Sequence, residues 1–217
     1  MSFTKTIIFF PGFLKSSDDF EYTESGKKIG ITSCINKRAN VHKVSLTKDD
    51  YLKPIDEILD EVMKEVFDKF KSKKIILVGH SFGAFYVLRC VELYKNRIDG
   101  ILLIDPTFRD HSYRSKLFLK LDEYKKKEDW DRNILTQCKL DRFYDLTNGE
   151  NIGCNLEIVV MINVTNEDDK TDKIKYYKDL IKDFGKEKSQ LVIYNNLSHM
   201  IHYKRSADVI KIINDML

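Results

Sequence analysis

One serine stands in a pattern that could do covalent chemistry. Ser81 lies at the centre of Gly-His-Ser-Phe-Gly, residues 79–83, between a short apolar run at 75–78 and a helical periodicity at 82–94. A serine at the tip of a tight strand-to-helix turn projects its hydroxyl above the sheet, and flanking glycines remove side chains that would collide there. The N–H groups of the following helix face any negative charge that develops. The pattern predicts that Ser81 is a nucleophile.

A hydroxyl nucleophile needs a general base within reach, and histidine is the usual one. The sequence has five histidines: His42, His80, His111, His199 and His202. Among these, His199 follows the last predicted strand and precedes the final predicted helix, so we expect it to be the base. His80, inside the pentapeptide, is expected to point away from the serine hydroxyl as a packed or hydrogen-bonded side chain. His202 could substitute, but it is expected to be a structural neighbour at the helix start.

The base in turn needs a carboxylate that fixes its tautomer and stabilises the imidazolium. Residues 165–172, after the predicted strand 157–164, are rich in acidic side chains. The interval from Asp168 to His199 leaves room for one helix and one strand, and we therefore predict Asp168 as the acid. The alternatives are Asp169, Asp172, Glu167 and, after the preceding strand, Asp105.

These residues must be positioned by an alternation of apolar strands and amphipathic helices. The expected strands are 4–10, 41–46, 74–78, 98–104, 157–164 and 190–194, and the expected helices are 54–70, 82–94, 171–184 and 206–217. Continuously apolar strands are typical of parallel sheets covered on both faces. We predict one α/β domain over residues 1–217, a doubly wound, mostly parallel sheet of about six strands. Residues 106–155 have helical character without a convincing strand, and are expected to form a cap-like insertion.

The composition of the chain argues against several classes of protein. The chain has 217 residues, with 37 basic and 34 acidic side chains and a net charge of +3, which gives no reason to expect a nucleic-acid partner. No apolar run is long enough to span a membrane. The four cysteines are far apart, which suits reduced thiols and a cytoplasmic protein. Since no metal-ligand pattern, phosphate loop or dinucleotide fingerprint appears, we expect no metal and no cofactor.

Taken together, these segments resemble the α/β-hydrolase fold family. Residues 9–14, Phe-Phe-Pro-Gly-Phe-Leu, resemble the segment after the family's third strand, with Pro11 in place of its usual histidine. The resemblance implies an oxyanion hole formed by the backbone N–H groups of Phe13 and Phe82. Residues 197–202 resemble the family's catalytic-histidine loop, with Ser198 where glycine is common.

The resemblance implies a serine hydrolase of the esterase, thioesterase or lipase type. Its partner would be a small-molecule substrate with an apolar acyl group, and residues 106–155 occupy the place of the family's lid. Two alternatives remain: a binding protein that keeps the fold without turnover, and an acyltransferase in which an alcohol replaces water. The oligomeric state is left open.

Overall fold

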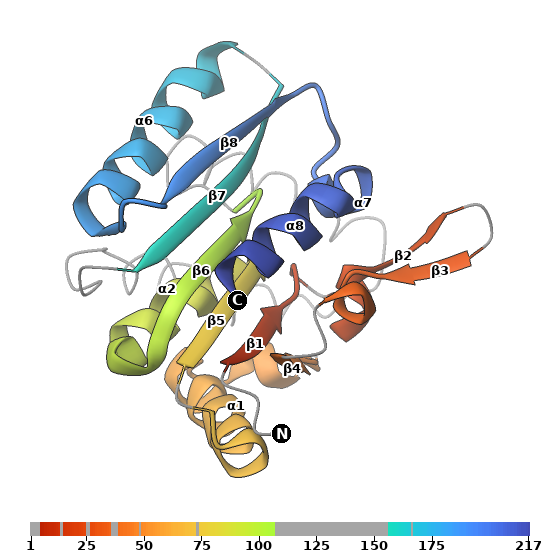
Figure 1. The fold of residues 1–217 in the computed structure, drawn as a ribbon, viewed down its shortest axis with the longest axis vertical. Helices are drawn as coiled ribbons and strands as arrows, with labels where there is room; N and C mark the ends of the chain where they lie inside the picture. Colours follow the sequence, from red (N-terminus) through yellow and green to blue (C-terminus); the bar gives the residue numbers. More distant parts are fainter. Residues whose placement is uncertain are drawn as a thin grey trace.

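The computed structural model (Figure 1) describes two long stretches of the chain. They are residues 5–106, apart from 14, 25–26, 36–38, 48 and 73, and residues 156–217, apart from 166. The expected cap-like insertion at 106–155 lies, beyond Pro106, outside the described residues.

The centre of the molecule is a six-stranded sheet in the order β4-β1-β5-β6-β7-β8. Every neighbouring pair is parallel, which confirms the predicted α/β class. The strands are β1 (Lys5–Phe10), β4 (Ala39–Lys43), β5 (Lys74–His80), β6 (Ile98–Ile104), β7 (Glu157–Val164) and β8 (Gln190–Asn195). The carboxyl ends of parallel strands share one edge of a sheet, where ligands bind in open α/β folds.

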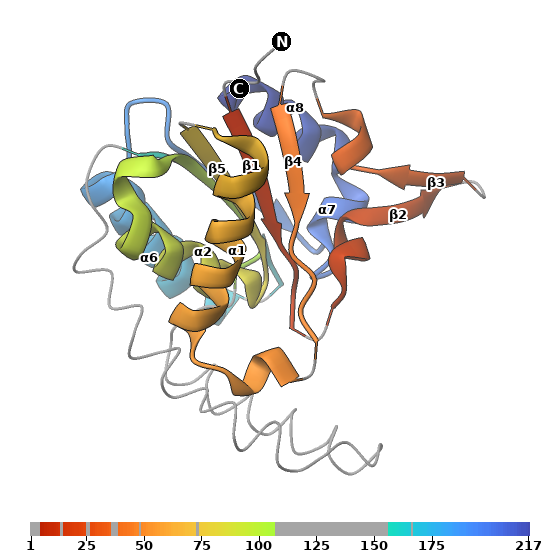
Figure 2. The same ribbon diagram turned by 90° about the horizontal axis from the view of Figure 1, so that it is seen from below.

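Helices cover both faces of this sheet, as Figure 2 shows. One face carries α1 (Ile55–Phe70), α2 (Gly83–Tyr94) and α6 (Glu167–Phe184), and the other carries α7 (Ile201–Lys204) and α8 (Ser206–Met216). Strand β1 illustrates the cause: Ile8 and Phe10 pack into the first layer, whereas Ile7 and Phe9 pack into the second. Alternate residues of a strand point to opposite faces, so a strand buried twice must be apolar throughout.

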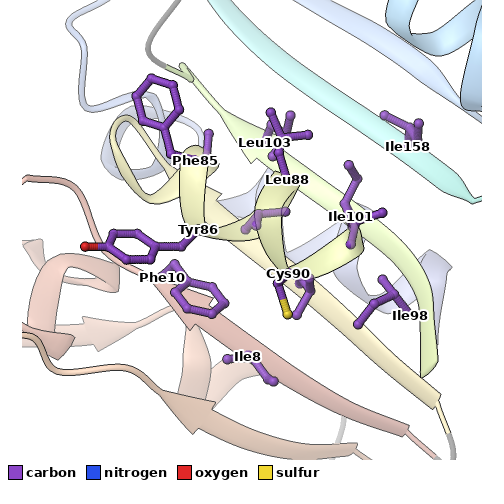
Figure 3. Close-up of a cluster of buried hydrophobic side chains, with 14 of the residues drawn as sticks. Ile8, Phe10, Phe85, Tyr86, Leu88, Cys90, Ile98, Ile101, Leu103 and Ile158 are labelled. Atoms are coloured by element: carbon purple, nitrogen blue, oxygen red, sulfur yellow. The ribbon is translucent and has the colours of Figure 1, made fainter. Parts of the chain in front are cut away.

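Helix α2, which follows the predicted nucleophile, is deeply buried. Tyr86, Val87, Cys90 and Val91 have no exposed surface. Figure 3 shows Tyr86 and Cys90 facing the strand side chains of β1 and β6. A helix buried to this extent fixes the position of the turn that precedes it.

The segment at residues 21–30 and the start of α6 differ from the sequence-based prediction. Residues 21–30 form an antiparallel hairpin of β2 (Glu21–Glu24) and β3 (Lys27–Gly30), which projects from the body in Figure 2. Its strands are short and rich in charged residues, so the sequence shows no apolar alternation from which they could be predicted. Helix α6 begins at Glu167, not at Thr171. Acidic residues are favoured in the first turn of a helix because they face its positive end, and residues 167–169 form that turn.

None of the helices in the described ranges combines the length and apolar character that crossing a membrane requires.

Candidate active site

Ser81 lies in the turn between β5 and α2. Its backbone φ of 52° places a non-glycine residue in the left-handed region. Such a conformation costs on the order of 1 kcal/mol or more and persists only where its surroundings enforce it. Here the Ser81 N–H donates to the carbonyl oxygen of Ile104 at 2.9 Å, which ties the turn to the end of β6. The strained turn is the geometry that the pentapeptide predicts.

The two glycines of the pentapeptide are required by close packing. A Cβ at Gly83 would collide with the carbonyl oxygens of Phe10 and Pro11. One at Gly79 would lie 2.8 Å from the Val87 side chain and from the Gly83 carbonyl oxygen. The absence of a side chain at Gly83 lets the turn sit against the end of β1 and the loop after it, and its absence at Gly79 lets α2 pack against β5.

The predicted base, His199, lies against the carboxylate of Asp105. The Nδ1 atom of His199 lies 2.7 Å from Oδ2 of Asp105. Asp105 is buried, whereas the His199 side chain is 49% exposed. The Asp105 carboxylate is therefore shielded from water, whereas a reactant can approach the His199 imidazole.

The sequence predicted Asp168 as the acid, whereas the carboxylate found against His199 is that of Asp105. Asp168 belongs to the first turn of α6. Asp105 instead occupies a left-handed turn directly after β6, with φ of 38°, and its N–H donates to the Met161 carbonyl oxygen of β7 at 2.7 Å. This turn presents the Asp105 carboxylate to the histidine loop. The choice of Asp168 stays a prediction from the sequence, and the carboxylate that the structure describes against His199 is that of the alternative, Asp105.

The second carboxylate oxygen of Asp105, Oδ1, is held by two residues other than His199. Oδ1 accepts a hydrogen bond from Lys173 Nζ at 2.8 Å and another from the Asn163 N–H at 3.1 Å. Burial raises the pKa of this carboxyl, but the hydrogen bond from His199 and the charge of Lys173 outweigh it and leave the pKa below its ordinary value. Asp105 is therefore ionised at neutral pH. Neither Lys173 nor Asn163 was singled out from the sequence, because no local pattern marks them.

The loop that carries His199 is pinned at two points. The Asn163 side chain accepts the Leu197 N–H at 2.9 Å and donates to the Leu197 carbonyl oxygen. The carbonyl oxygen of His199 lies 3.3 Å from Nε2 of His80, and the two imidazole rings are 5.0 Å apart between centroids. Since His80 directly precedes Ser81, this contact brings the predicted base beside the nucleophile turn.

The two residues predicted for the oxyanion hole are also adjacent. Phe82 immediately precedes α2, and Phe13 lies in the loop after β1. Their rings meet edge-on with centroids 5.2 Å apart. Phe13 and Phe82, whose N–H groups are the predicted donors, thus come from two segments that meet at the nucleophile elbow, the turn of residues 79–83 around Ser81.

His80 and His202 are both buried, as expected for side chains without a reacting role. Nδ1 of His80 lies 2.7 Å from Oδ2 of Asp19, and Nε2 of His202 donates to the Asp19 carbonyl oxygen at 2.7 Å. In the part of the chain that the structure describes, Asp19, His80 and His202 are close enough to be candidate metal ligands, with donor atoms within 4.8 Å of one another. Nothing in the sequence distinguishes Asp19 from the many other acidic residues of the chain.

His202 should make the fold sensitive to acid. Burial, and then the charge of His80, lower the pKa of His202 to about 3. Its Nδ1 has no hydrogen-bond partner among the described residues, so a second proton there would be buried without an acceptor. Between pH 3 and 6.5 the unfolded chain binds this proton and the folded chain does not, so stability falls as pH falls through that window. One such proton is worth about 1.4 kcal/mol per pH unit, or about 2 kcal/mol between pH 7 and 5.

Denaturant unfolding of the wild type and of His202→Gln at several pH values measures this contribution. The glutamine amide can still donate to the Asp19 carbonyl oxygen but does not titrate. The variant should show a flatter dependence of unfolding free energy on pH between 7 and 5. Parallel curves for the two proteins would contradict the assignment of a neutral His202.

Comparison with known proteins bears on the fold of this chain. No curated protein sequence matches the chain. Solved structures of similar fold include a monoacylglycerol lipase from Paleococcus ferrophilus, with a TM-score of 0.62 and 11% identity, covering 98% of this chain and 95% of the lipase. An esterase from a marine microorganism has a TM-score of 0.62 and 12% identity, with the same two coverages of 98% and 95%. Epoxide hydrolase I from potato has a TM-score of 0.63 and 12% identity, covering 97% of this chain and 92% of that enzyme.

At such low identity these likenesses establish the fold alone. The sequence itself matches the family model described as alpha/beta hydrolase fold over residues 5–135, more than half of its length. That match spans β1, the elbow around Ser81 and the turn of Asp105. With the parallel sheet and the strained elbow, it shows that this chain belongs to the α/β-hydrolase fold family.

Proposed function

We propose that this protein is a serine hydrolase that cleaves a carboxylic ester or thioester through an acyl-enzyme. In this proposal Ser81 is the nucleophile, His199 the general base and Asp105 the acid. The observation that carries it is the His199–Asp105 contact of 2.7 Å on a loop held beside the strained Ser81 turn. A solvent-accessible imidazole backed by a buried carboxylate next to a strained serine is an arrangement that acyl transfer requires.

The first half-reaction forms the acyl-enzyme. Ser81 Oγ attacks the acyl carbon while His199 accepts its hydroxyl proton, and Asp105 stabilises the resulting imidazolium. The backbone N–H groups of Phe13 and Phe82 donate to the oxyanion of the tetrahedral intermediate. When the intermediate collapses, the bond to the leaving oxygen or sulfur breaks, and His199 returns the proton to that atom.

The second half-reaction restores the enzyme. Water attacks the acyl-serine carbonyl, His199 removes one water proton, and collapse releases the carboxylic acid while the proton returns to Ser81 Oγ. All proton transfers use side chains of this chain, so the proposed cycle calls for no cofactor. The partly exposed Phe13 ring against Phe82 favours an apolar acyl group, because aromatic walls gain most from covering apolar surface.

An active-site-directed fluorophosphonate tests the proposal directly. We expect one covalent adduct per chain by intact mass spectrometry, located on Ser81 by peptide mapping, and turnover of p-nitrophenyl esters or acyl thioesters in a chain-length series. Adding a short alcohol during turnover separates water from alcohol as acceptor by the products. Failure to label Ser81 together with no turnover across the series would favour a binding protein without catalysis.

Lys173 should set the pH range of this reaction. Its ammonium lies 2.8 Å from Asp105, so it balances part of the negative charge that His199 experiences. Lys173→Met removes that balance and favours the protonated imidazole, which cannot act as a base. The acid limb of the kcat/KM profile should therefore move to higher pH, by up to about one pH unit for a cation this close to the pair.

Lys173→Arg is the matched control, because it keeps a cation at the same place on α6. Its acid limb should stay near that of the wild type. A Lys173→Met profile that is lower at every pH but unshifted would mean that Lys173 is only a structural brace.

A further inference from the structure

Asn163 is a polar residue in a strand that is otherwise apolar near its end. Residues 158–164 of β7 read Ile-Val-Val-Met-Ile-Asn-Val. Asparagine is depleted in strands, and a residue that breaks the local pattern of its element is expected where function requires it. Asn163 lies one residue before the carboxyl end of β7, at the same sheet edge as Ser81 after β5 and Asp105 after β6.

The side chain of Asn163 holds the backbone of the loop that carries His199. Its Oδ1 accepts the Leu197 N–H at 2.9 Å, and its Nδ2 donates to the Leu197 carbonyl oxygen. The N–H requires the amide oxygen and the carbonyl requires the amide nitrogen, so the two contacts fix the orientation of the amide. Asn163 and Leu197 are 34 residues apart in the chain, and Leu197 lies two residues before His199.

The backbone of Asn163 holds the carboxylate that faces His199. Its N–H donates to Asp105 Oδ1 at 3.1 Å, while Oδ2 of the same carboxylate lies 2.7 Å from His199 Nδ1. The Asn163 carbonyl oxygen accepts a hydrogen bond from Lys173 Nζ at 3.3 Å, and that ammonium also contacts Asp105. One residue therefore contacts both the loop of His199 and the carboxylate of Asp105.

The position of the His199 ring depends on how the backbone of its loop is held, because the side chain itself is half exposed. The loop begins where the Asn196 N–H donates to the Val164 carbonyl oxygen at 3.1 Å. It is held again where the His199 carbonyl oxygen lies 3.3 Å from His80 Nε2. The contact of Asn163 lies between these two points, directly before the residues whose placement decides where the imidazole points.

We infer that Asn163 is a positioning residue of the proposed hydrolase, which holds the His199 loop with its side chain and the Asp105 carboxylate with its backbone. In this role it aligns the imidazole between that carboxylate and the Ser81 hydroxyl. The inference rests on the proposed function for its kinetic consequence, whereas the hold on the loop can be observed without any substrate. Asn163 touches no reacting atom in the proposed cycle and acts through the residues that it contacts.

The first test is kinetic and uses Asn163→Leu, which removes the amide but keeps the size of the side chain and the backbone N–H. We expect kcat to fall by about 10²-fold with KM changed by less than about threefold, because a displaced base loses its alignment while the groups that bind substrate remain. The rate is expressed per active site, counted by complete labelling with the fluorophosphonate, so that unfolded protein cannot imitate the effect. A folded variant that keeps kcat, or whose loss lies in KM, overturns the inference.

Asn195→Leu is the matched control. Asn195 is the exposed last residue of β8, at the same sheet edge, and it lies opposite Val164 in the strand register. The same substitution there should leave kcat within about threefold of the wild type. Equal losses in the two variants would mean that an apolar side chain at this edge, and not the loss of the Asn163 amide, lowers the rate.

The second test follows hydrogen exchange of the Leu197 amide in the substrate-free protein. We expect this amide to exchange slowly in the wild type, although Ser198 and His199 beside it are exposed. One ordinary hydrogen bond shifts an equilibrium by about tenfold, so Asn163→Leu should accelerate exchange by about tenfold to a hundredfold. The Leu102 amide in the central strand β6 reports on unfolding of the whole domain and should change by less than about threefold. Equal acceleration of both amides would mean that Asn163 stabilises the fold and not the loop.

These outcomes separate the inference from the proposed function. If the wild type neither labels at Ser81 nor hydrolyses any ester, the proposed hydrolase fails, and the Leu197 exchange still decides whether Asn163 holds the loop. If the wild type is active and a folded Asn163→Leu variant is equally active, the inference fails and the hydrolase stands. Should the variant not fold, fast exchange of Leu197 in the folded wild type overturns the inference, and slow exchange supports the contact on which it depends.

Discussion

Ser81→Ala should lower kcat for ester hydrolysis by about 10⁶-fold and abolish fluorophosphonate labelling. A triad that loses its nucleophile loses the covalent route entirely, and what remains comes from binding and the oxyanion hole. Stopped assays with a chromogenic ester, on protein purified free of host esterases, measure this loss. Residual hydrolysis within about a hundredfold of the wild type would contradict Ser81 as the nucleophile.

Ser81→Gly separates this chemistry from folding. Glycine adopts a φ of 52° without the strain that serine carries there. We expect the variant to be as inactive as Ser81→Ala and yet more stable, by about 1 kcal/mol in unfolding free energy. A less stable glycine variant would mean that the turn is not strained.

Asp105→Asn should reduce kcat by about 10⁴-fold. An amide can donate to His199 Nδ1 and select the wrong tautomer, and it cannot stabilise the imidazolium. The variant should also be less stable above pH 4, because Lys173 loses the carboxylate that it contacts. The ionised Asp105 stabilises the fold above its unfolded pKa of 3.8, and this contribution disappears as pH falls through its lower folded pKa.

Asp168→Asn is the matched comparison, because the sequence alone favoured that residue. We expect it to keep kcat within about threefold of the wild type, since an acidic residue in the first turn of a helix contributes at most a few tenths to about 1 kcal/mol to stability. Equal losses in the two variants, or a greater loss in Asp168→Asn, would return the acid to the loop after β7.

The fold class could be predicted from the sequence alone, and so could two of the three residues proposed for catalysis. Alternating apolar strands and amphipathic helices predict a parallel sheet, because a strand covered on both faces must be apolar throughout. Ser81 and His199 could be found because each is marked locally. Ser81 has glycines at fixed offsets that only a tight turn requires, and His199 lies between the last strand and the last helix.

The carboxylate beside His199, the cation beside that carboxylate and the buried Asp19–His80 contact depend on tertiary structure. Asp105 is followed by proline, which suits an ordinary turn, and its role depends on a left-handed turn held by β7. The contacts that matter join residues far apart in the chain: Lys173 to Asp105, His199 to Asp105 and Asp19 to His80. The residues next to a carboxylate in the sequence indicate only whether it suits a water-exposed position or the start of a helix. Whether it faces a histidine is fixed by strand order and packing, which bring separate turns to the same edge of the sheet.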